Sequence, residues 1–163
     1  MDRTLEDMRM NRLAVIGLGV TVAGILLVIG FWPLFSVSGA DLLASRNGNQ
    51  YTGYTQGSQI MVHEKVLDVS FSNFFGNPTT TLEIEDGNPN DATVIYVRGD
   101  ARNVVSPGDV IFASATLQLI AGFYYWEVAS PGNIHLSWPI DALFYGIAAA
   151  GVVALGVAAF RKP

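Results

Sequence analysis

Two apolar stretches bracket this chain of 163 residues and constrain its fold more than any other feature. The first covers residues 13–35 and the second residues 140–160. Each is long enough, as a helix, to cross the roughly 30 Å hydrocarbon core of a bilayer. Charged residues make up only 14% of the sequence, and they are almost absent from both stretches. This segregation predicts a small domain that is tethered to a membrane at both ends.

The ends of both stretches carry residues that are typical of a membrane interface. Trp32 and Pro33 suit the exit of the first helix, and Trp138 and Pro139 suit the start of the second. A cleaved signal peptide is the alternative for the first stretch. Its apolar run is longer than the core of signal peptides, which is roughly 7–15 residues, so we expect a retained anchor.

Basic residues near the two stretches indicate the orientation of the chain. They lie mostly toward the chain ends, at Arg3, Arg9, Arg12, Arg161 and Lys162. Only Arg46 lies close to a stretch on the inner side. Cytoplasmic flanks are enriched in Lys and Arg, so we expect both termini to be cytoplasmic and the central domain extracytoplasmic. The sequence therefore predicts an integral membrane protein with the lipid bilayer as one partner.

The predicted organisation has seven segments. They are a cytoplasmic N-terminus (1–12), transmembrane helix 1 (13–37), a linker (38–57), a β domain (58–130), a juxtamembrane loop (131–138), transmembrane helix 2 (139–160) and a cytoplasmic C-terminus (161–163). The linker assignment depends on the Gly, Asn, Gln and Thr content of residues 45–57, which show no apolar periodicity.

The middle of the chain shows five strand signals separated by turn residues. They cover residues 58–71, 79–85, 93–98, 110–120 and 123–129. In the first strand the apolar residues change from even to odd positions, so strict alternation cannot place them on one face. This change of parity predicts a bulge between His63 and Val66 that bends the strand.

These strands resemble the general pattern of OB-fold domains. The resemblance is carried by the runs KVLDVSF, TTLEIEDG, TVIYVRGD, SPGDVIFASATLQ and YYWEV, with a short insertion between the third and fourth strands. It implies a mainly β fold, a five-stranded OB-like barrel flanked by N- and C-terminal transmembrane helices. A small β-sandwich is the alternative, because strand signals alone do not determine topology.

The charge of the central domain bears on its partners. Residues 38–138 contain four Lys and Arg but ten Asp and Glu. Phosphate binding depends on cationic neutralisation, so this balance disfavours nucleic acid as a partner. Phe71, Phe74 and Phe75 lie in or beside a predicted hairpin loop, and no Lys or Arg lies within residues 72–78. We expect these aromatic residues to contact the bilayer, a protein partner or the end of the barrel.

The two histidines are the candidates for cofactor binding. His63 is expected to be a solvated strand residue, because no second metal ligand lies at a useful spacing. His135 follows the last strand, and the layout is similar to that of the haem chaperone of cytochrome c maturation. That resemblance implies haem binding at His135. The sequence departs from the chaperone at Pro139, where the chaperone has a tyrosine, and it lacks the charged run around the histidine. The alternative is an interfacial loop histidine and no cofactor.

Catalytic motifs are missing from the sequence. It contains no cysteine, no Gly-x-Ser-x-Gly motif, no P-loop and no pair of histidines at metal-binding spacing. We therefore expect a chain that is not an enzyme and that holds no metal.

Small residues recur in the second apolar stretch at every fourth position. They are Gly146, Ala150, Ala154 and Ala158. A stripe of small residues lets two helix backbones approach closely in a bilayer. The predicted partner is either the first helix, through Gly17, Thr21 or Gly24, or a helix of another subunit, which includes a homo-oligomer.

Together these features favour a non-catalytic binding or assembly module that faces the extracytoplasmic side, as a subunit or accessory factor of a membrane or envelope complex. Two alternatives remain open at this point. One is a haem-handling chaperone that uses His135, and the other is an oligosaccharide- or peptide-binding module.

Overall fold

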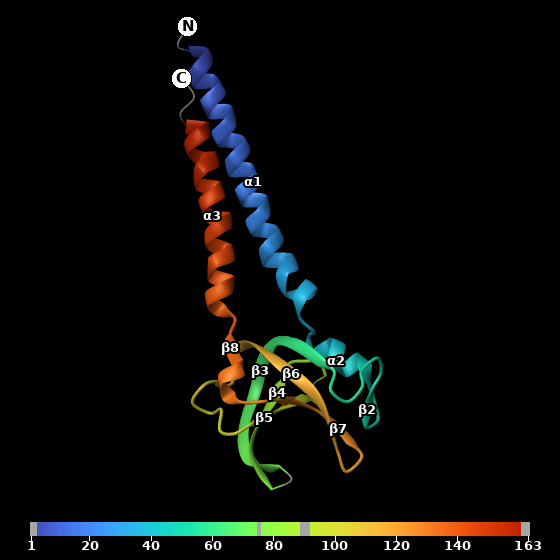
Figure 1. The fold of residues 1–163 in the computed structure, drawn as a ribbon. Coiled ribbons are helices and arrows are strands. Elements are labelled where there is room, and N and C mark those ends of the chain that lie inside the picture. Colours follow the sequence, from blue (N-terminus) through green and yellow to red (C-terminus); the bar gives the residue numbers. More distant parts are fainter. Residues whose placement is uncertain (1–2, 75, 89–91, 161–163) are drawn as a thin grey trace. The chain divides into compact units, whose positions relative to one another are not determined.

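The computed structural model describes residues 3–74, 76–88 and 92–160, with side chains from residue 12 onward. The chain divides into two compact units. One unit contains two long helices, α1 (Arg3–Phe35) and α3 (Trp138–Phe160), and the other holds the strands (Figure 1). The predicted cytoplasmic ends at residues 1–2 and 161–163 lie outside the described residues.

Both helices are long and apolar enough to cross a membrane. The candidate spans are Arg12–Phe35, with 24 residues, and Trp138–Phe160, with 23 residues. The first span ends two residues before the predicted boundary, because Val37 leaves the helix and forms a parallel bridge with Val62. Asp141 lies in the first turn of α3, where a carboxylate is favoured by the helix dipole.

The second unit, Phe35–Ser137, contains eight strands and two short helices among the described residues. In chain order they are α2 (Gly39–Ser45), β1 (Arg46–Asn47), β2 (Gln50–Tyr51), β3 (Gln59–Phe74), β4 (Asn77–Ile84), β5 (Thr93–Arg98), β6 (Val110–Ile120), β7 (Phe123–Val128), η1 (Pro131–Asn133) and β8 (Ile134–Leu136). The predicted third and fourth strands are confirmed at both ends.

The main sheet closes on itself, because β3 pairs with β4 at one end of the strand order and also with β6 near the other end. The first part of β3 pairs with β6 and the second part pairs with β4, both antiparallel, and β3 runs along both strands in Figure 1. The strand order is β3–β4–β5–β7–β6, with β8 added beside β6. Because β5 and β7 pair in parallel, the sheet is mixed. This order makes the fold OB-like.

The bend in β3 lies further along the strand than predicted. The register shift falls between Val66 and Asp68, not between His63 and Val66. At this position β3 changes partners: the Val66 amide donates to the carbonyl of Asp109, and the Glu85 amide donates to the carbonyl of Lys65. The exchange of neighbouring strands determines the position of the bulge, and local side-chain parity does not reveal it.

Residues 38–57 are not the linker that the sequence predicted. Ser38 and Asp41 form a capping box that starts α2, and Leu42 on this helix is fully buried in the core. A Cβ on Gly39 would collide with the backbone of Glu85, so glycine permits this close approach. Composition suggested a flexible segment, but one buried leucine and one helix cap are enough to tie it to the sheet.

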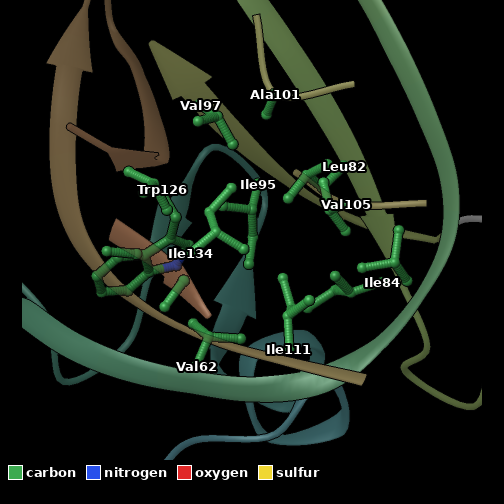
Figure 2. Close-up of a cluster of buried hydrophobic side chains, with 14 of the residues drawn as sticks. Val62, Leu82, Ile84, Ile95, Val97, Ala101, Val105, Ile111, Trp126 and Ile134 are labelled. Carbon is green, nitrogen blue, oxygen red and sulfur yellow. The ribbon is translucent and has the colours of Figure 1, made fainter. Parts of the chain in front are cut away.

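The core of this unit follows the alternation of apolar side chains along the strands. Ile95 and Val97 point inward from β5, while Trp126 points inward from β7 (Figure 2). Their neighbours at odd spacing, including Tyr96 and Tyr125, therefore belong to the other face of the strands. This outer face carries the candidate site.

Candidate binding cleft

A cleft of about 380 Å³ lies on the surface of the sheet unit. Its size falls within the range of roughly 300–1,000 Å³ that is usual for small-molecule sites. The described residues that line it come from β1–β2, β3, β5 and β7 and their flanks: Arg46, Gly48, Asn49, Tyr51, Phe74, Ala92, Val94, Tyr96, Phe123, Tyr124 and Tyr125. More than half of these residues are aromatic.

Three of the aromatic rings pack against one another. The ring of Phe74 stacks on that of Tyr96 with centroids 4.2 Å apart and an interplanar angle of 19°. Tyr125 meets both rings edge-on, at 5.1 Å from Phe74 and 5.5 Å from Tyr96. Edge-to-face contacts such as those of Tyr125 are among the favourable arrangements for aromatic pairs. These ring contacts hold this wall of the cleft in place.

The hairpin formed by β1 and β2 supplies a second wall. Its tip has Gly48 in the left-handed region, at φ 61°. The backbone amide of Tyr124 donates to the carbonyl of Asn49 over 3.3 Å, which ties the tip to β7. Tyr51 packs edge-on against the buried Trp126, with centroids 5.6 Å apart. The hairpin is thus fixed to the core and brings Arg46 to the cleft.

Burial affects the ionisation of the tyrosines in the cleft. Burial raises the pKa of Tyr51 and the pKa of Tyr96, and the positive charge of Arg46 opposes both increases. The pKa of Tyr125 is also raised, first by burial and then by the carboxylate of Glu127. The three phenols are therefore neutral at neutral pH, where each hydroxyl both donates and accepts a hydrogen bond.

Of the predicted partner-binding residues, the structure brings one into the cleft. Phe74 lines it, as described above. Phe71 is not among the lining residues: its ring lies under the Arg102 guanidinium, 4.5 Å from the ring centroid, and the side chain is 38% exposed. Phe75 lies outside the described residues. Two of the three predicted aromatics therefore have no described place in this site.

The two histidines share one row of the sheet. Phe112 on β6 pairs with His63 on β3 and with His135 on β8. The exposed ring of His135 lies 5.1 Å from the Phe112 ring, with a tilt of 33°. Among residues 12–74, 76–88 and 92–160, no group of three or more His, Cys, Asp or Glu side chains is placed to hold a metal ion.

The closest contacts between α1 and α3 lie at Ala148 and Gly151 of α3, beside the predicted stripe of small residues that starts at Gly146. A Cβ on Gly24 would lie 2.5 Å from the Ala148 backbone nitrogen, and one on Gly151 would meet the backbone of Thr21. A Cβ on Gly146 would meet no atom within 4 Å, and Ala150 is exposed. Ala154 is half-buried and Ala158 is buried. The α1 side of the contact uses Gly17, Thr21 and Gly24, the residues that the sequence offered for it.

Sequence reasoning missed most of the cleft. Tyr96 and Tyr125 carried a usable signal, because alternation along their strands places them opposite the buried Ile95 and Trp126. The parallel pairing of β5 with β7 brings them together, and strand signals do not reveal that pairing. Arg46 and Tyr51 were assigned to the linker, so their place in the cleft depends on the position of the hairpin.

No protein-family model matches this chain, and no curated protein matches it either. A solved structure that is similar in fold comes from the crystal structure of the S. pombe Stn1–Ten1 complex, with a TM-score of 0.37 and 7% sequence identity. The match covers 64% of this chain and 78% of the other.

The prediction that nucleic acid is an unlikely partner was wrong in its reasoning. The physical basis of that expectation does not hold in the cleft. That basis was the charge summed over residues 38–138, which does not describe the local surface. Among the described lining residues there is one arginine, Arg46, and no Asp or Glu. The net charge of the domain therefore does not describe the charge of the residues that line the cleft.

Proposed function

We propose that this chain is a non-catalytic, membrane-anchored binding module and that the aromatic cleft is its ligand site. The main support is the cleft itself, which combines packed aromatic rings with a few polar groups, as ligand sites usually do. The pairing of β3 with both β4 and β6 supports a five-stranded OB barrel as the scaffold of the cleft. On this view the protein is a subunit or accessory factor of a membrane or envelope complex.

The proposed topology places the cleft outside the cytoplasm. The support is the excess of Arg and Lys on the terminal side of both apolar helices, with Arg46 alone close to a helix on the domain side. A membrane-impermeant thiol reagent should therefore label a cysteine placed at Asn49 or Asn88 in intact cells, and it should not label one at Thr4. The chain has no native cysteine to confuse the result. The reverse labelling pattern would contradict the outward orientation.

The helix pair is proposed to contribute a second contact surface. Gly146 and Ala150 are exposed on α3 and are not used against α1, so they are available to a helix of a partner protein or of a second copy. Replacing both by leucine should release such a partner without unfolding the sheet, as measured by size-exclusion chromatography in detergent. An unchanged elution volume would argue against this surface.

Photo-crosslinking in native membranes tests the cleft as the ligand site. A photoreactive phenylalanine analogue at Phe123, which is 53% exposed and lines the cleft, should form an adduct that mass spectrometry detects. The same analogue at Phe71, which is also exposed but does not line the cleft, is the matched control and should form no such adduct. Absence of an adduct at Phe123, or equal adducts at both positions, would contradict the proposal.

A haem-handling chaperone is the second candidate function. The observation that favours it is the exposed His135 beside the flat ring of Phe112, because histidine is a common axial ligand of haem iron. Purified protein supplied with haem should then show a Soret band that His135→Ala abolishes and His63→Ala leaves unchanged. If neither variant differs from the parent protein, this candidate fails.

A further inference from the structure

We infer that one outward face of the sheet unit rests on the phospholipid headgroups of the bilayer. The first half of β3 and the start of β6 form this surface, which is called the lipid face below. Its side chains are those of Met61, His63, Lys65, Val110 and Phe112. The inference rests on the proposed membrane anchoring and adds a second contact surface, separate from the cleft.

Alternation along the two strands defines the lipid face. Val62 on β3 and Ile111 on β6 are fully buried and point into the core (Figure 2). Met61 and Val110 lie one position away, so their side chains point to the outside of the sheet. Met61 is 37% exposed and Val110 is 39% exposed. The face therefore presents apolar side chains that the sheet unit leaves partly uncovered.

The chain reaches both candidate membrane spans beside this face. The Val37 amide donates to the carbonyl of Met61 over 2.7 Å, and only Ser36 separates Val37 from the end of α1. The Ser137 amide donates to the carbonyl of Val110 over 2.9 Å, and α3 begins at the next residue. Consecutive Cα atoms are about 3.8 Å apart, so each attachment point lies within about 8 Å of the end of a span.

Two attachments of this kind keep the lipid face at the membrane surface. Val37 bridges to β3 and Ser137 bonds to β6, and these two strands pair with each other. A single attachment would let the sheet unit turn about the chain, whereas two attachments to paired strands remove most of that freedom. Trp138, the first residue of α3, is exposed, and tryptophan is enriched at the level of the headgroups. The lipid face is therefore held at that level.

The charges of the lipid face suit a surface of phospholipid headgroups. Every residue of β3 and β6 is described, and the outward positions of residues 59–65 and 110–116 carry no Asp or Glu, although the domain is acidic overall. The one carboxylate in these segments, Glu64, accepts hydrogen bonds from the amides of Gly39 and Lys65. The exposed Lys65 side chain supplies an ammonium group, which pairs with phosphate oxygens.

The lipid face and the cleft lie at opposite ends of the same strands. Val110 begins β6, whereas Phe123 of the cleft follows shortly after its other end. Phe74 of the cleft is the last residue of β3. The cleft thus stays open to a ligand while the other end of these strands contacts lipid. Phe112 of the lipid face lies beside His135, so a face that lipid covers is closed to haem.

Fluorescence quenching in the full-length chain tests the inference. The chain has no native cysteine, so Met61→Cys and Val110→Cys can each carry one environment-sensitive fluorophore. The protein is reconstituted in nanodiscs of phosphatidylcholine and phosphatidylglycerol that contain a lipid spin-labelled at its headgroup. Emission from both positions should shift to the blue and be quenched. Phe71→Cys and Leu119→Cys are the matched controls, because these side chains are each 38% exposed on the other halves of β3 and β6, and they should show neither effect.

A charge variant tests the same face without relying on one label position. Lys65→Glu replaces attraction by repulsion, so it should lower the equilibrium constant for docking by about fivefold or more, measured as lost quenching at position 61. Arg102→Glu makes the same change in charge at an exposed residue outside the face and should leave the quenching unchanged. The near-ultraviolet circular dichroism of the buried Trp126 reports on the fold of every variant. Equal losses in both variants would overturn the inference.

A fluorophore within a span separates this inference from the anchoring. Leu26 is exposed near the middle of the first candidate span, so Leu26→Cys should be quenched most by a lipid spin-labelled at the end of its acyl chain. If Leu26 is quenched but Met61 and Val110 are quenched no more than Phe71 and Leu119, the inference is overturned and the anchoring stands. If the label at Leu26 is not quenched either, both proposals are overturned.

Discussion

The helix pair and the sheet unit use the same apolar residue types in opposite ways. In the helices, large side chains face outward: Val15 is 70% exposed and Leu34 is 78% exposed. In the sheet unit, Leu82, Ile84 and Leu117 are fully buried. The contact between α1 and α3 instead uses small residues such as Gly24 and Gly151, which allow the backbones to meet.

This difference is the one that we expect if the helices lie in a bilayer, as proposed, and the sheet unit lies in water. In water, burial of large apolar side chains drives folding, so they gather in the core of the sheet. In a bilayer the lipid tails are as apolar as leucine, so helices associate through close packing and polar contacts. The hydrogen bond from Trp32 Nε1 to Asp141 Oδ1, at 2.7 Å, is such a polar contact between α1 and α3. Single substitutions in the two regions test this comparison.

The largest expected effect comes from shortening one leucine in each region. Leu82→Ala removes a fully buried side chain and should destabilise the sheet unit by about 2–5 kcal/mol, because the cavity cannot fully collapse. Leu26→Ala, on a side chain that is 64% exposed on α1, should change the stability by no more than about 0.5 kcal/mol. Thermal unfolding of the full chain, followed by near-ultraviolet circular dichroism, measures both. Equal losses would mean that the helices fold as an aqueous core does.

The next largest effect on stability should come from adding one methyl group where the two helices meet. Gly24→Ala places a Cβ 2.5 Å from the Ala148 backbone nitrogen, so the helices must separate, at about 1–3 kcal/mol for overpacking. Gly146→Ala is the matched control, because nothing lies within 4 Å of its Cβ position.

Thiol cross-linking measures this separation. Cysteines placed at Phe31 and Phe144, whose ring centroids are 5.1 Å apart, should cross-link through a short bifunctional reagent. Gly24→Ala should reduce the yield and Gly146→Ala should not. If both variants cross-link as well as the parent, close backbone packing does not hold the helices together.

The smallest expected effect concerns a buried carboxylate at the end of β4. Burial opposes the charge of Asp86, but hydrogen bonds from the hydroxyl and amide of Thr93 and the amide of Asn88 outweigh it, so the pKa of Asp86 lies below its usual 3.8. The unfolded chain therefore binds a proton more readily than the folded one. This contribution to stability is present above a pH of 3.8 and is lost as the pH falls through the folded value.

Replacing this carboxylate should remove that pH dependence. Asp86→Asn should cost about 1–2 kcal/mol at neutral pH, because a hydrogen bond to a charged acceptor becomes one to a neutral acceptor. Asp100→Asn is the control. Its carboxylate pairs with the exposed Arg102 guanidinium, which lowers the pKa of Asp100 to about 2. High salt should screen this exposed ion pair but should not weaken the hydrogen bonds of Asp86. Acid unfolding at low and high salt distinguishes the two. An unchanged acid transition in Asp86→Asn would contradict the role assigned to this side chain.

Local patterns predicted several strands of this protein well. The strands at 93–98 and 110–120 are confirmed at both ends because alternation and flanking turn residues are local signals. The bulge in β3 was misplaced, since its position depends on the exchange of β6 for β4 as the partner strand. The linker assignment failed because Leu42 is buried through a tertiary contact that composition does not encode.

The cleft also shows the difference between what local sequence patterns predict and what depends on tertiary contacts. The sequence places Phe74, Tyr96 and Tyr125 on strands that lie some 20 to 50 residues apart along the chain, and only Phe74 had been selected from it. Sheet closure brings them within a few ångströms, as the 4.2 Å stack of Phe74 on Tyr96 shows. A ligand site built from separate strands has no single motif for a sequence to reveal.

By itself the sequence determined the two apolar spans, most of the strands and the inward or outward direction of their side chains. These features follow from runs and alternation of apolar residues, which reflect the solvent around each segment. Only the tertiary structure decided the parallel pairing of β5 with β7, the position of the 46–51 hairpin and the stripe of α3 that meets α1. The physical reason is that these depend on which distant segments pack together, and a local pattern of residues is compatible with several such arrangements.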